Sequence, residues 1–205
     1  MISALGTMLS ILLPATIVGA KTGETGSSHT LENLQAAFNG ESNACNNYLA
    51  FAKKADAEGY GAVASLFRAA AKAEEIHAGN HAAVIRKLGA EPKADILAPQ
   101  VKSTRENLAA AIAGETYERD TMYPEFIAEA KTAKNSDALR TFTFALKTEA
   151  EHARLYTEAL NKLEKLKGAG KQYFVCKVCG YTTENLNFLR CLVCGVAKTE
   201  YVPVS

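Results

Sequence analysis

Apolar residues recur every three or four positions along four long stretches of the chain, which is the pattern of amphipathic helices. The stretches cover residues 31–58, residues 62–88, a segment that starts at residue 103, and residues 136–167. Ser103 and Glu106 have the capping-box form at the start of the third stretch, and Pro124 is expected to kink or interrupt it. The pattern therefore predicts an all-α four-helix bundle.

The lengths of the connections between these stretches indicate the topology of the bundle. Short turns join the first helix to the second and the third to the fourth, whereas the segment after Gly89, which contains Pro92 and Pro99, is long enough to cross the bundle. Four amphipathic helices with two short turns and one long crossover are typical of a ferritin-like fold. The fourth helix is expected to end before Gly168.

Six acidic or imidazole side chains fall on the apolar stripes, where an unpaired charge is costly unless it is protonated, hydrogen-bonded or bound to metal. They are Glu41, Glu74, His77, Glu115, Glu149 and His152. Each half of the chain offers one Glu from its first helix and a Glu-x-x-His pair from its second, and residues three apart share a helix face. Corresponding residues of the halves lie 74 or 75 positions apart. The repeat predicts a two-metal site in the bundle, with iron or manganese favoured by the mixed ligands.

The repeat has one break. Glu118 follows Glu115 by three positions, whereas Ala44 stands three positions after Glu41. One metal is therefore offered a carboxylate that the other lacks. Cys45 lies one turn beyond Glu41, where a small core residue is the expected role and a redox or ligand role is the alternative. His81 lies one turn beyond His77 and is expected to bond to solvent or a carbonyl instead of being a third imidazole ligand.

The C-terminal segment carries two Cys-x-x-Cys-Gly knuckles. Their cysteines are Cys176, Cys179, Cys191 and Cys194. This spacing is typical of a tetrahedral four-thiolate metal site, and the glycine after each knuckle can adopt a left-handed conformation. Zinc fits four cysteines equally well, but iron is favoured because the neighbouring two-metal site needs electrons. The pattern divides the chain into an apolar leader and linker (1–29), the bundle (30–168) and a small cysteine domain (171–205).

Composition narrows the classes of partner and compartment. The 205 residues include 23 basic and 22 acidic side chains, so nothing points to nucleic acid or to an anionic membrane. Residues 1–20 form an apolar run without a charged side chain, which suits a signal peptide or a marginal anchor. Because no Lys or Arg precedes this run, a cytoplasmic protein is the expectation, and export or anchoring through residues 1–20 is the alternative.

Several of these motifs together resemble rubrerythrin over residues 30–204. They are the segments 38–42 (FNGES), 74–77 (EEIH) and 114–126 (GETYERDTMYPEF), together with the two knuckles. The resemblance implies di-iron ligands at Glu41, Glu74, His77, Glu115, Glu118, Glu149 and His152, and a rubredoxin-type iron on the four cysteines. It also implies that Tyr48 and Tyr123 hold ligand carboxylates by hydrogen bonds. The chain departs from the family at residues 43–47 (NACNN), where members often carry an Arg.

The family resemblance implies a non-haem di-iron peroxidase for oxidative stress defence. Such a protein reduces hydrogen peroxide to water with electrons from the rubredoxin-type iron, and one iron exchanges Glu118 for His77 on reduction. The expected partners are hydrogen peroxide and an electron-donating reductase or rubredoxin. Two alternatives remain open: a ferritin-like ferroxidase that handles iron, and a non-enzymatic binding protein with a zinc ribbon.

Helix length suggests an oligomer. The 15 residues from His152 to Lys167 would span about 22 Å as a helix and would carry the cysteine site away from its own di-iron centre. A head-to-tail homodimer or higher homo-oligomer would return it to a partner's bundle, and this is the expected assembly.

Overall fold

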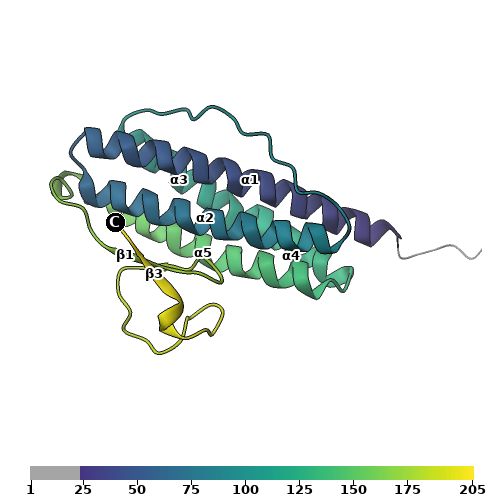
Figure 1. The fold of residues 1–205 in the computed structure, drawn as a ribbon. Coiled ribbons are helices and arrows are strands. Elements are labelled where there is room, and N and C mark those ends of the chain that lie inside the picture. Colours follow the sequence, from purple (N-terminus) through teal and green to yellow (C-terminus); the bar gives the residue numbers. More distant parts are fainter. Residues whose placement is uncertain (1–23) are drawn as a thin grey trace, which may run out of the picture.

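Residues 24–205 of the chain are described by a computed structural model, with side chains from residue 29 onward. It consists of a long helical bundle with a small domain on its flank (Figure 1). The apolar leader expected over residues 1–20 lies outside the described residues. Within the described range, no helix combines the length and the apolar character needed to cross a bilayer.

Five α-helices build the bundle. They are α1 (Glu24–Ala57), α2 (Gly61–Lys87), α3 (Thr104–Tyr117), α4 (Tyr123–Thr132) and α5 (Ser136–Asn161). α1 packs on α2, whereas α3 and α4 together form the third rod of the bundle and pack on α5 (Figure 1). This arrangement of two helical hairpins confirms the predicted ferritin-like bundle.

Two helix ends differ from the sequence-based expectation. α1 begins at Glu24, although the linker was expected to reach residue 29; near its start Thr30 is buried and Leu31 packs on the core. α5 ends at Asn161, and the short 3-10 turn Leu163–Lys165 (η2) follows. The regular helix thus ends six residues before its predicted limit, and Leu163 in the 3-10 turn is buried in the core.

The third rod of the bundle changes its winding where Pro124 was expected to disturb it. The Ser103 capping box is present, and α3 passes into a π-helical turn, Glu118–Met122 (η1), before α4 starts. Pro124 lies in the first turn of α4, where its missing N–H is tolerated. Because a proline cannot bond to the carbonyl four residues earlier, the preceding turn widens instead of breaking. Glu118 therefore sits on a wider turn than Glu115.

The crossover from α2 to α3 runs as an extended segment along α1 (Figure 1). Four amide side chains at helical spacing on α1 bond to its backbone: Gln35, Asn39, Asn43 and Asn46. At Asn43, Nδ2 donates to the Asp95 carbonyl at 2.9 Å and Oδ1 accepts from the Leu97 amide at 2.9 Å. Two asparagines from the segment that departs from the family pattern thus hold the crossover in place.

The cysteine domain contains a small antiparallel sheet of β1 (Tyr173–Cys176), β2 (Thr182–Thr183) and β3 (Tyr201–Val204), in the order β2-β1-β3. The chain turns back after α5 and returns along α2. The Gly168 amide donates to the Gly59 carbonyl at 2.9 Å, and the Lys171 amide donates to Ser65 Oγ at 3.1 Å. β1 then packs on α2. The expectation that the cysteine site lies far from its own bundle centre is therefore wrong, because the chain reverses where a continued helix was assumed.

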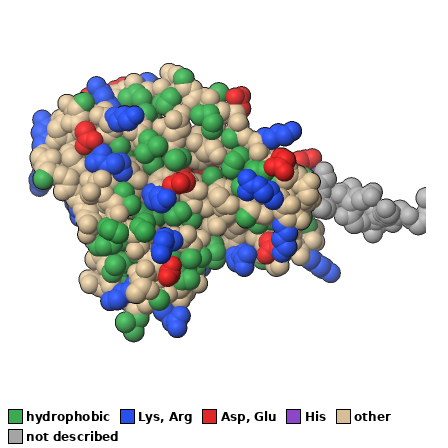
Figure 2. Space-filling view, viewed as in Figure 1, with side chains coloured by type: hydrophobic (Ala, Val, Ile, Leu, Met, Phe, Trp, Pro, Cys, Tyr) green, Lys and Arg blue, Asp and Glu red, His purple; other side chains and the backbone are tan. Residues whose placement is uncertain are grey.

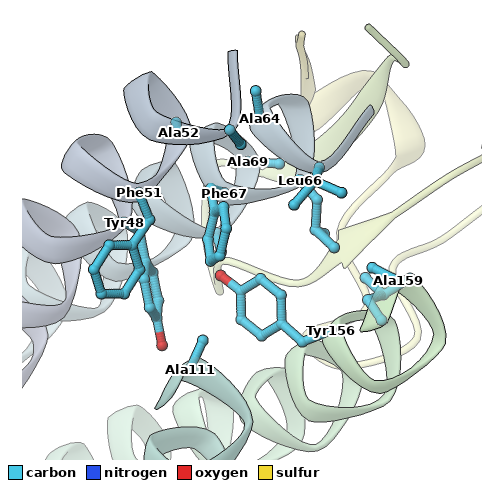
Figure 3. Close-up of a cluster of buried hydrophobic side chains, with 14 of the residues drawn as sticks. Tyr48, Phe51, Ala52, Ala64, Leu66, Phe67, Ala69, Ala111, Tyr156 and Ala159 are labelled. Carbon is cyan, nitrogen blue, oxygen red and sulfur yellow. The ribbon is translucent and has the colours of Figure 1, made fainter. Parts of the chain in front are cut away.

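Two apolar clusters lie at successive levels of the bundle. One is built around four aromatic rings in tilted or edge-on contact, Tyr48, Phe51, Phe67 and Tyr156, and Figure 3 shows them converging from facing helices. The other surrounds Tyr123 and Phe142. On the outside, Lys and Arg are interspersed with Asp and Glu over the face drawn in Figure 2. Along the helices, the six polar residues of the apolar stripes fall between the two clusters.

Candidate di-metal centre and four-cysteine site

Six polar side chains meet in the middle of the bundle. α1 supplies Glu41, α2 supplies Glu74 and His77, α3 supplies Glu115, and α5 supplies Glu149 and His152. Each is at most 1% exposed. Their ligand atoms form two groups of four, in each of which all atoms lie within 4.8 Å of one another. Glu74 and Glu149 belong to both groups, as two bridging carboxylates between neighbouring cations would.

The two imidazoles face the shared carboxylates from opposite sides. Nδ1 of His77 lies 2.8 Å from Glu74 Oε2 and 3.0 Å from Glu149 Oε1. Nδ1 of His152 lies 3.1 Å from Glu74 Oε1 and 3.1 Å from Glu149 Oε2. Glu115 adds Oε1 at 3.4 Å from His152 Nδ1. The arrangement has the approximate two-fold repeat that the sequence spacing predicts.

The donor set fits two cations. Buried atoms without a hydrogen-bond partner gather here: Glu41 Oε2, Glu74 Oε1, Glu115 Oε2, both oxygens of Glu149, and His152 Nδ1. The short distance from His152 to Glu74 is thus a contact without hydrogen-bond alignment. Burying so many unsatisfied polar atoms would be costly without a bound group. Carboxylate and imidazole donors suit iron or manganese.

The pKa shifts of the site residues also indicate that the crowded carboxylates favour positive charge nearby. Burial, with the Glu74 and Glu149 carboxylates adding to it, raises the pKa of Glu115 to about 8 even though His152 opposes the shift. At Glu74 burial opposes ionisation, but His152 and His77 outweigh it and lower the pKa to about 2. Burial disfavours a charged His77, yet Glu149 and Glu74 raise its pKa. The carboxylates therefore favour positive charge at the positions of the imidazoles, and they would favour bound metal cations for the same reason.

Glu118 stands apart from the two groups. It is half-buried on the π-helical turn, and its carboxylate belongs to neither set of four ligand atoms in the described residues. Burial, with the nearby Glu41 and Glu115 carboxylates adding to it, raises its pKa. The structure therefore brings six of the seven residues at which ligands were expected into direct contact and leaves the seventh beside them.

Two buried tyrosines bond to ligand carboxylates. Tyr48 Oη donates to Glu115 Oε1 at 2.7 Å, and Tyr123 Oη donates to Glu41 Oε1. Each hydroxyl is thus bonded to a carboxylate that belongs to the grouped ligand atoms. Tyr156, which no sequence pattern marked beyond its place on the apolar stripe, is also buried near the site. Its Oη has no hydrogen-bond partner in the described residues.

The first cysteine knuckle covers the outer edge of one imidazole, and strand β2, which follows it, covers that of the other. His77 Nε2 lies 3.0 Å from the Cys179 carbonyl oxygen, and Thr148 Oγ1 donates to the same carbonyl at 3.2 Å. His152 Nε2 lies 3.1 Å from Thr182 Oγ1. Such partners fix the ring orientation of an imidazole that binds metal through its other nitrogen. The two candidate sites are therefore joined through one hydrogen bond within a single chain.

Gly180 makes this close approach possible. Its φ is +78°, and a Cβ at this position would overlap the His77 ring, 2.9 Å from Cδ2. Gly195, in the second knuckle, also has a φ of +78° but has nothing within 4 Å of its Cβ position. The left-handed conformation predicted for the glycine of each knuckle is confirmed. Only Gly180 is also required by packing.

The four cysteines of the knuckles form one cluster. Sγ of Cys176 lies 3.6 Å from Sγ of Cys194, and Sγ of Cys179 lies 3.5 Å from Sγ of Cys191. All four are free thiols grouped as metal ligands. The hydrogen bond from the Cys179 thiol lowers the pKa of Cys176 to about 5, so one thiolate is available at neutral pH. The cluster fits a tetrahedral four-thiolate ion.

Cys45 and His81 have no place among the grouped ligand atoms. Burial and the carboxylates of Glu74 and Glu75 raise the pKa of Cys45 to about 11, so its half-buried thiol stays neutral and packs against the core. His81 is fully buried, contrary to the expectation that it would reach solvent. It contacts the Tyr123 and Thr141 hydroxyls instead.

Comparison with known proteins gives a consistent picture. The Rubrerythrin family model matches residues 32–160. Nigerythrin of Nitratidesulfovibrio vulgaris is 38% identical over 181 residues, covering 87% of this chain and 88% of that protein. Rubrerythrin-2 of Clostridium acetobutylicum is 35% identical and covers 84% of this chain and 95% of its own length.

Solved structures agree with these sequence matches. A structure of fully reduced, all-ferrous nigerythrin superposes with a TM-score of 0.79 at 34% identity, covering 96% of this chain and all of that one. A bacterioferritin of Desulfovibrio desulfuricans has a TM-score of 0.66 at 21% identity and supports the bundle fold alone. The similarity to nigerythrin extends over the bundle and the cysteine domain together.

Proposed function

The chain belongs to the rubrerythrin family, and on that premise we propose that it reduces hydrogen peroxide to water. It is a di-iron protein of oxidative-stress defence, with the oxidoreductase chemistry of its relatives. Its cofactors are two non-haem iron ions and one iron in a four-cysteine, rubredoxin-type site. The observation that carries the proposal is the direct hydrogen bond between the two sites, from His77 to the Cys179 carbonyl.

In the proposed assignment, the di-iron pair is held by Glu41, Glu74, His77, Glu115, Glu149 and His152, with Glu118 beside them. The third iron is held by Cys176, Cys179, Cys191 and Cys194. When bound, the di-iron pair supplies Lewis acidity and one electron per metal, and the four-cysteine iron passes electrons one at a time. The protein contributes a dry interior and fixed ligand orientations.

His77 and Glu118 are the residues proposed to respond to the oxidation state. A neutral imidazole suits ferrous iron and a carboxylate suits ferric iron. His77 belongs to one group of four ligand atoms, whereas Glu118 lies just outside both. The π-helical turn gives Glu118 a backbone with a longer hydrogen-bond repeat, and such turns occur frequently at functional sites. Exchange of Glu118 for His77 is therefore compatible with the local backbone.

Tyr48 and Tyr123 have a supporting role in the proposal. Each hydroxyl holds one carboxylate oxygen of a terminal ligand, Glu115 and Glu41 respectively. These bonds leave the second oxygen of each carboxylate for the metal. Fixed carboxylates keep the ligand geometry constant while charge changes at the centre.

The cysteine domain is proposed to deliver electrons to the bundle of its own chain. The Cys179 carbonyl contacts His77, while the second knuckle exposes Leu192 and the neighbouring Leu189 to solvent. An external reductase or rubredoxin would therefore meet the second knuckle. A homodimer or higher homo-oligomer stays part of the proposal, but the electron route no longer requires it. A cytoplasmic site of action is also proposed.

Comparing oxidants tests the function. Fully reduced protein should be oxidised by hydrogen peroxide much faster than by oxygen, whereas a ferroxidase that handles iron would consume oxygen readily and release or store ferric iron. An absorption spectrum of the native protein tests the zinc-ribbon alternative, because a ferric four-thiolate site is coloured and zinc is not. A colourless protein that leaves peroxide unchanged would refute the proposal.

A further inference from the structure

One ligand of the four-cysteine site opens onto a cleft. Cys176, Cys179 and Cys191 are at most 4% exposed, whereas Cys194 is partly exposed. Cys194 lines a cleft of about 450 Å³ between the bundle and the cysteine domain. Because the other three cysteines are buried, the Cys194 side of the site is the one at which a small molecule can approach the metal and its sulfur ligands.

The cleft has apolar walls on both sides. Val84 of α2 and Phe144 of α5 line it from the bundle, and Val178 of the first knuckle lines it from the cysteine domain. Phe144 also packs against the cysteine cluster. Asn80 Nδ2 donates to the Val178 carbonyl at 2.9 Å and so ties the two walls together. Small-molecule sites usually have volumes of about 300–1,000 Å³ and mostly apolar walls, so the cleft has the size and lining of such a site.

The charged residues of the cleft favour an anionic ligand. Asp137 is the acidic residue that lines it, and this carboxylate accepts hydrogen bonds from both Arg140 and Lys87. Two cations share one carboxylate, so one positive charge is left unbalanced. The side chains of Arg140 and Lys87 are 66% and 71% exposed, which leaves N–H groups of both free to bind a second anion. A phosphate group suits such a pair of cations.

We propose that this cleft binds reduced flavin mononucleotide as an electron donor to the four-cysteine site. The flavin ring lies between the apolar walls beside Cys194, and its phosphate binds to Arg140 and Lys87. The site rests on the proposed function, which makes the cysteine domain the entry point for electrons. It is separate from the exposed Leu189 and Leu192, at which a protein donor would dock.

The chemistry of the acceptor selects the class of donor. A single four-cysteine iron accepts one electron at a time, so a reduced nicotinamide, which transfers a hydride, does not serve it directly. A reduced flavin can release its electrons singly. One reduced flavin loses two electrons and two ring protons, reduces the ferric cysteine site twice, and passes its protons to water. Reduction of one hydrogen peroxide to two water molecules consumes two electrons and two protons, so the balance closes.

Equilibrium dialysis tests the site without any turnover. The iron-loaded protein should bind one oxidised flavin mononucleotide per chain, with saturation below about 1 mM. Riboflavin, which lacks the phosphate, should bind about twofold to fivefold more weakly, as expected for an exposed ion pair. Combining Arg140→Gln with Lys87→Gln should remove this difference, whereas Arg105→Gln, whose arginine pairs with Glu164, should keep it. No bound flavin mononucleotide at 1 mM would overturn the proposal.

Ala83→Trp fills the cleft from the surface. Ala83 is an exposed residue of α2 that lines the cleft, so the indole ring takes the place of the flavin while the core stays unchanged. Binding of flavin mononucleotide should weaken about tenfold or more. On anaerobic mixing with excess photoreduced flavin mononucleotide, the rate of reduction of the four-cysteine site should saturate with flavin concentration in the unaltered protein. In Ala83→Trp this reduction should be about tenfold slower or worse, with unchanged iron content.

Ala109→Trp is the matched control for Ala83→Trp. Ala109 is exposed on α3 and does not line the cleft, so this variant should bind flavin and be reduced by it like the unaltered protein. If Ala83→Trp behaves in the same way, or if the rate rises linearly with flavin concentration, the flavin reacts elsewhere and the proposal is refuted. If flavin reduces the cysteine site as expected but peroxide does not reoxidise the protein, the proposed function fails while the flavin site stands.

Discussion

Replacing Gly180 by Ala should separate the cysteine domain from the bundle. A left-handed alanine costs about 1–2 kcal/mol in any context. At Gly180 the new Cβ would also overlap the His77 ring, 2.9 Å from Cδ2, where ordinary contact needs about 3.5–4 Å. The knuckle must move outward by roughly 1 Å, which removes the bond between His77 and the Cys179 carbonyl. Losing a buried partner adds about 1–3 kcal/mol.

Gly195→Ala is the matched control. Gly195 has the same φ of +78° in the second knuckle, with nothing within 4 Å of its Cβ position. It should therefore show only the conformational cost, whereas Gly180→Ala should be less stable by a further 1–3 kcal/mol or so in denaturant unfolding of the iron-loaded protein. Both variants should keep the colour of the four-cysteine site.

Electron delivery gives the second readout of this pair. With an external reductant supplied through the cysteine site, Gly180→Ala should turn over peroxide about tenfold more slowly or worse, because the contact at His77 is lost. Direct oxidation of its chemically reduced di-iron pair should stay close to normal. Equal stability and equal turnover of the two alanine variants would refute the reasoning that the first knuckle is docked on His77 of the same chain.

Three further outcomes are expected. Burial raises the pKa of Glu115 from 4.5 to about 8, so the folded state resists ionisation of this carboxyl group, and the metal-free protein should lose stability as pH rises from about 4.5 to about 8. Iron loading should remove this pH dependence in thermal unfolding scans. Cys45→Ala should retain peroxide turnover, and the native thiol should resist alkylation at pH 8, since its pKa is about 11. Asn43→Ala should cost about 1–3 kcal/mol and speed proteolysis of the crossover, because two loop bonds are lost.

Much of the fold follows from local patterns in the sequence. The apolar stripes locate the helices, and Ser103 starts α3 with its capping box as predicted. The Glu-x-x-His pairs lie three residues apart, so helical geometry alone places each pair on one face. Their convergence follows from the internal repeat, because two similar hairpins bury equivalent positions against each other.

Features that depend on distant contacts were not predictable in this way. The end of α5 and the return of the tail rest on the bond between Gly168 and Gly59, more than 100 residues apart. A helix-length argument assumed a straight continuation and so placed the cysteine site too far away. His81 was recognised only by its distance from His77, while its partners, Tyr123 and Thr141, lie 42 and 60 residues away. Nothing near His81 in the sequence marks those hydroxyls.

Stopped-flow mixing of the anaerobically reduced, iron-loaded protein with one equivalent of hydrogen peroxide tests the central claim most directly. Absorption of the di-iron pair and of the four-cysteine site can be followed in the same record. The account predicts that the di-iron pair is oxidised first and that the colour of the ferric four-cysteine site then grows as it returns electrons, without dependence on protein concentration. Oxidation of the cysteine site first, or no reaction before oxygen is admitted, would contradict it.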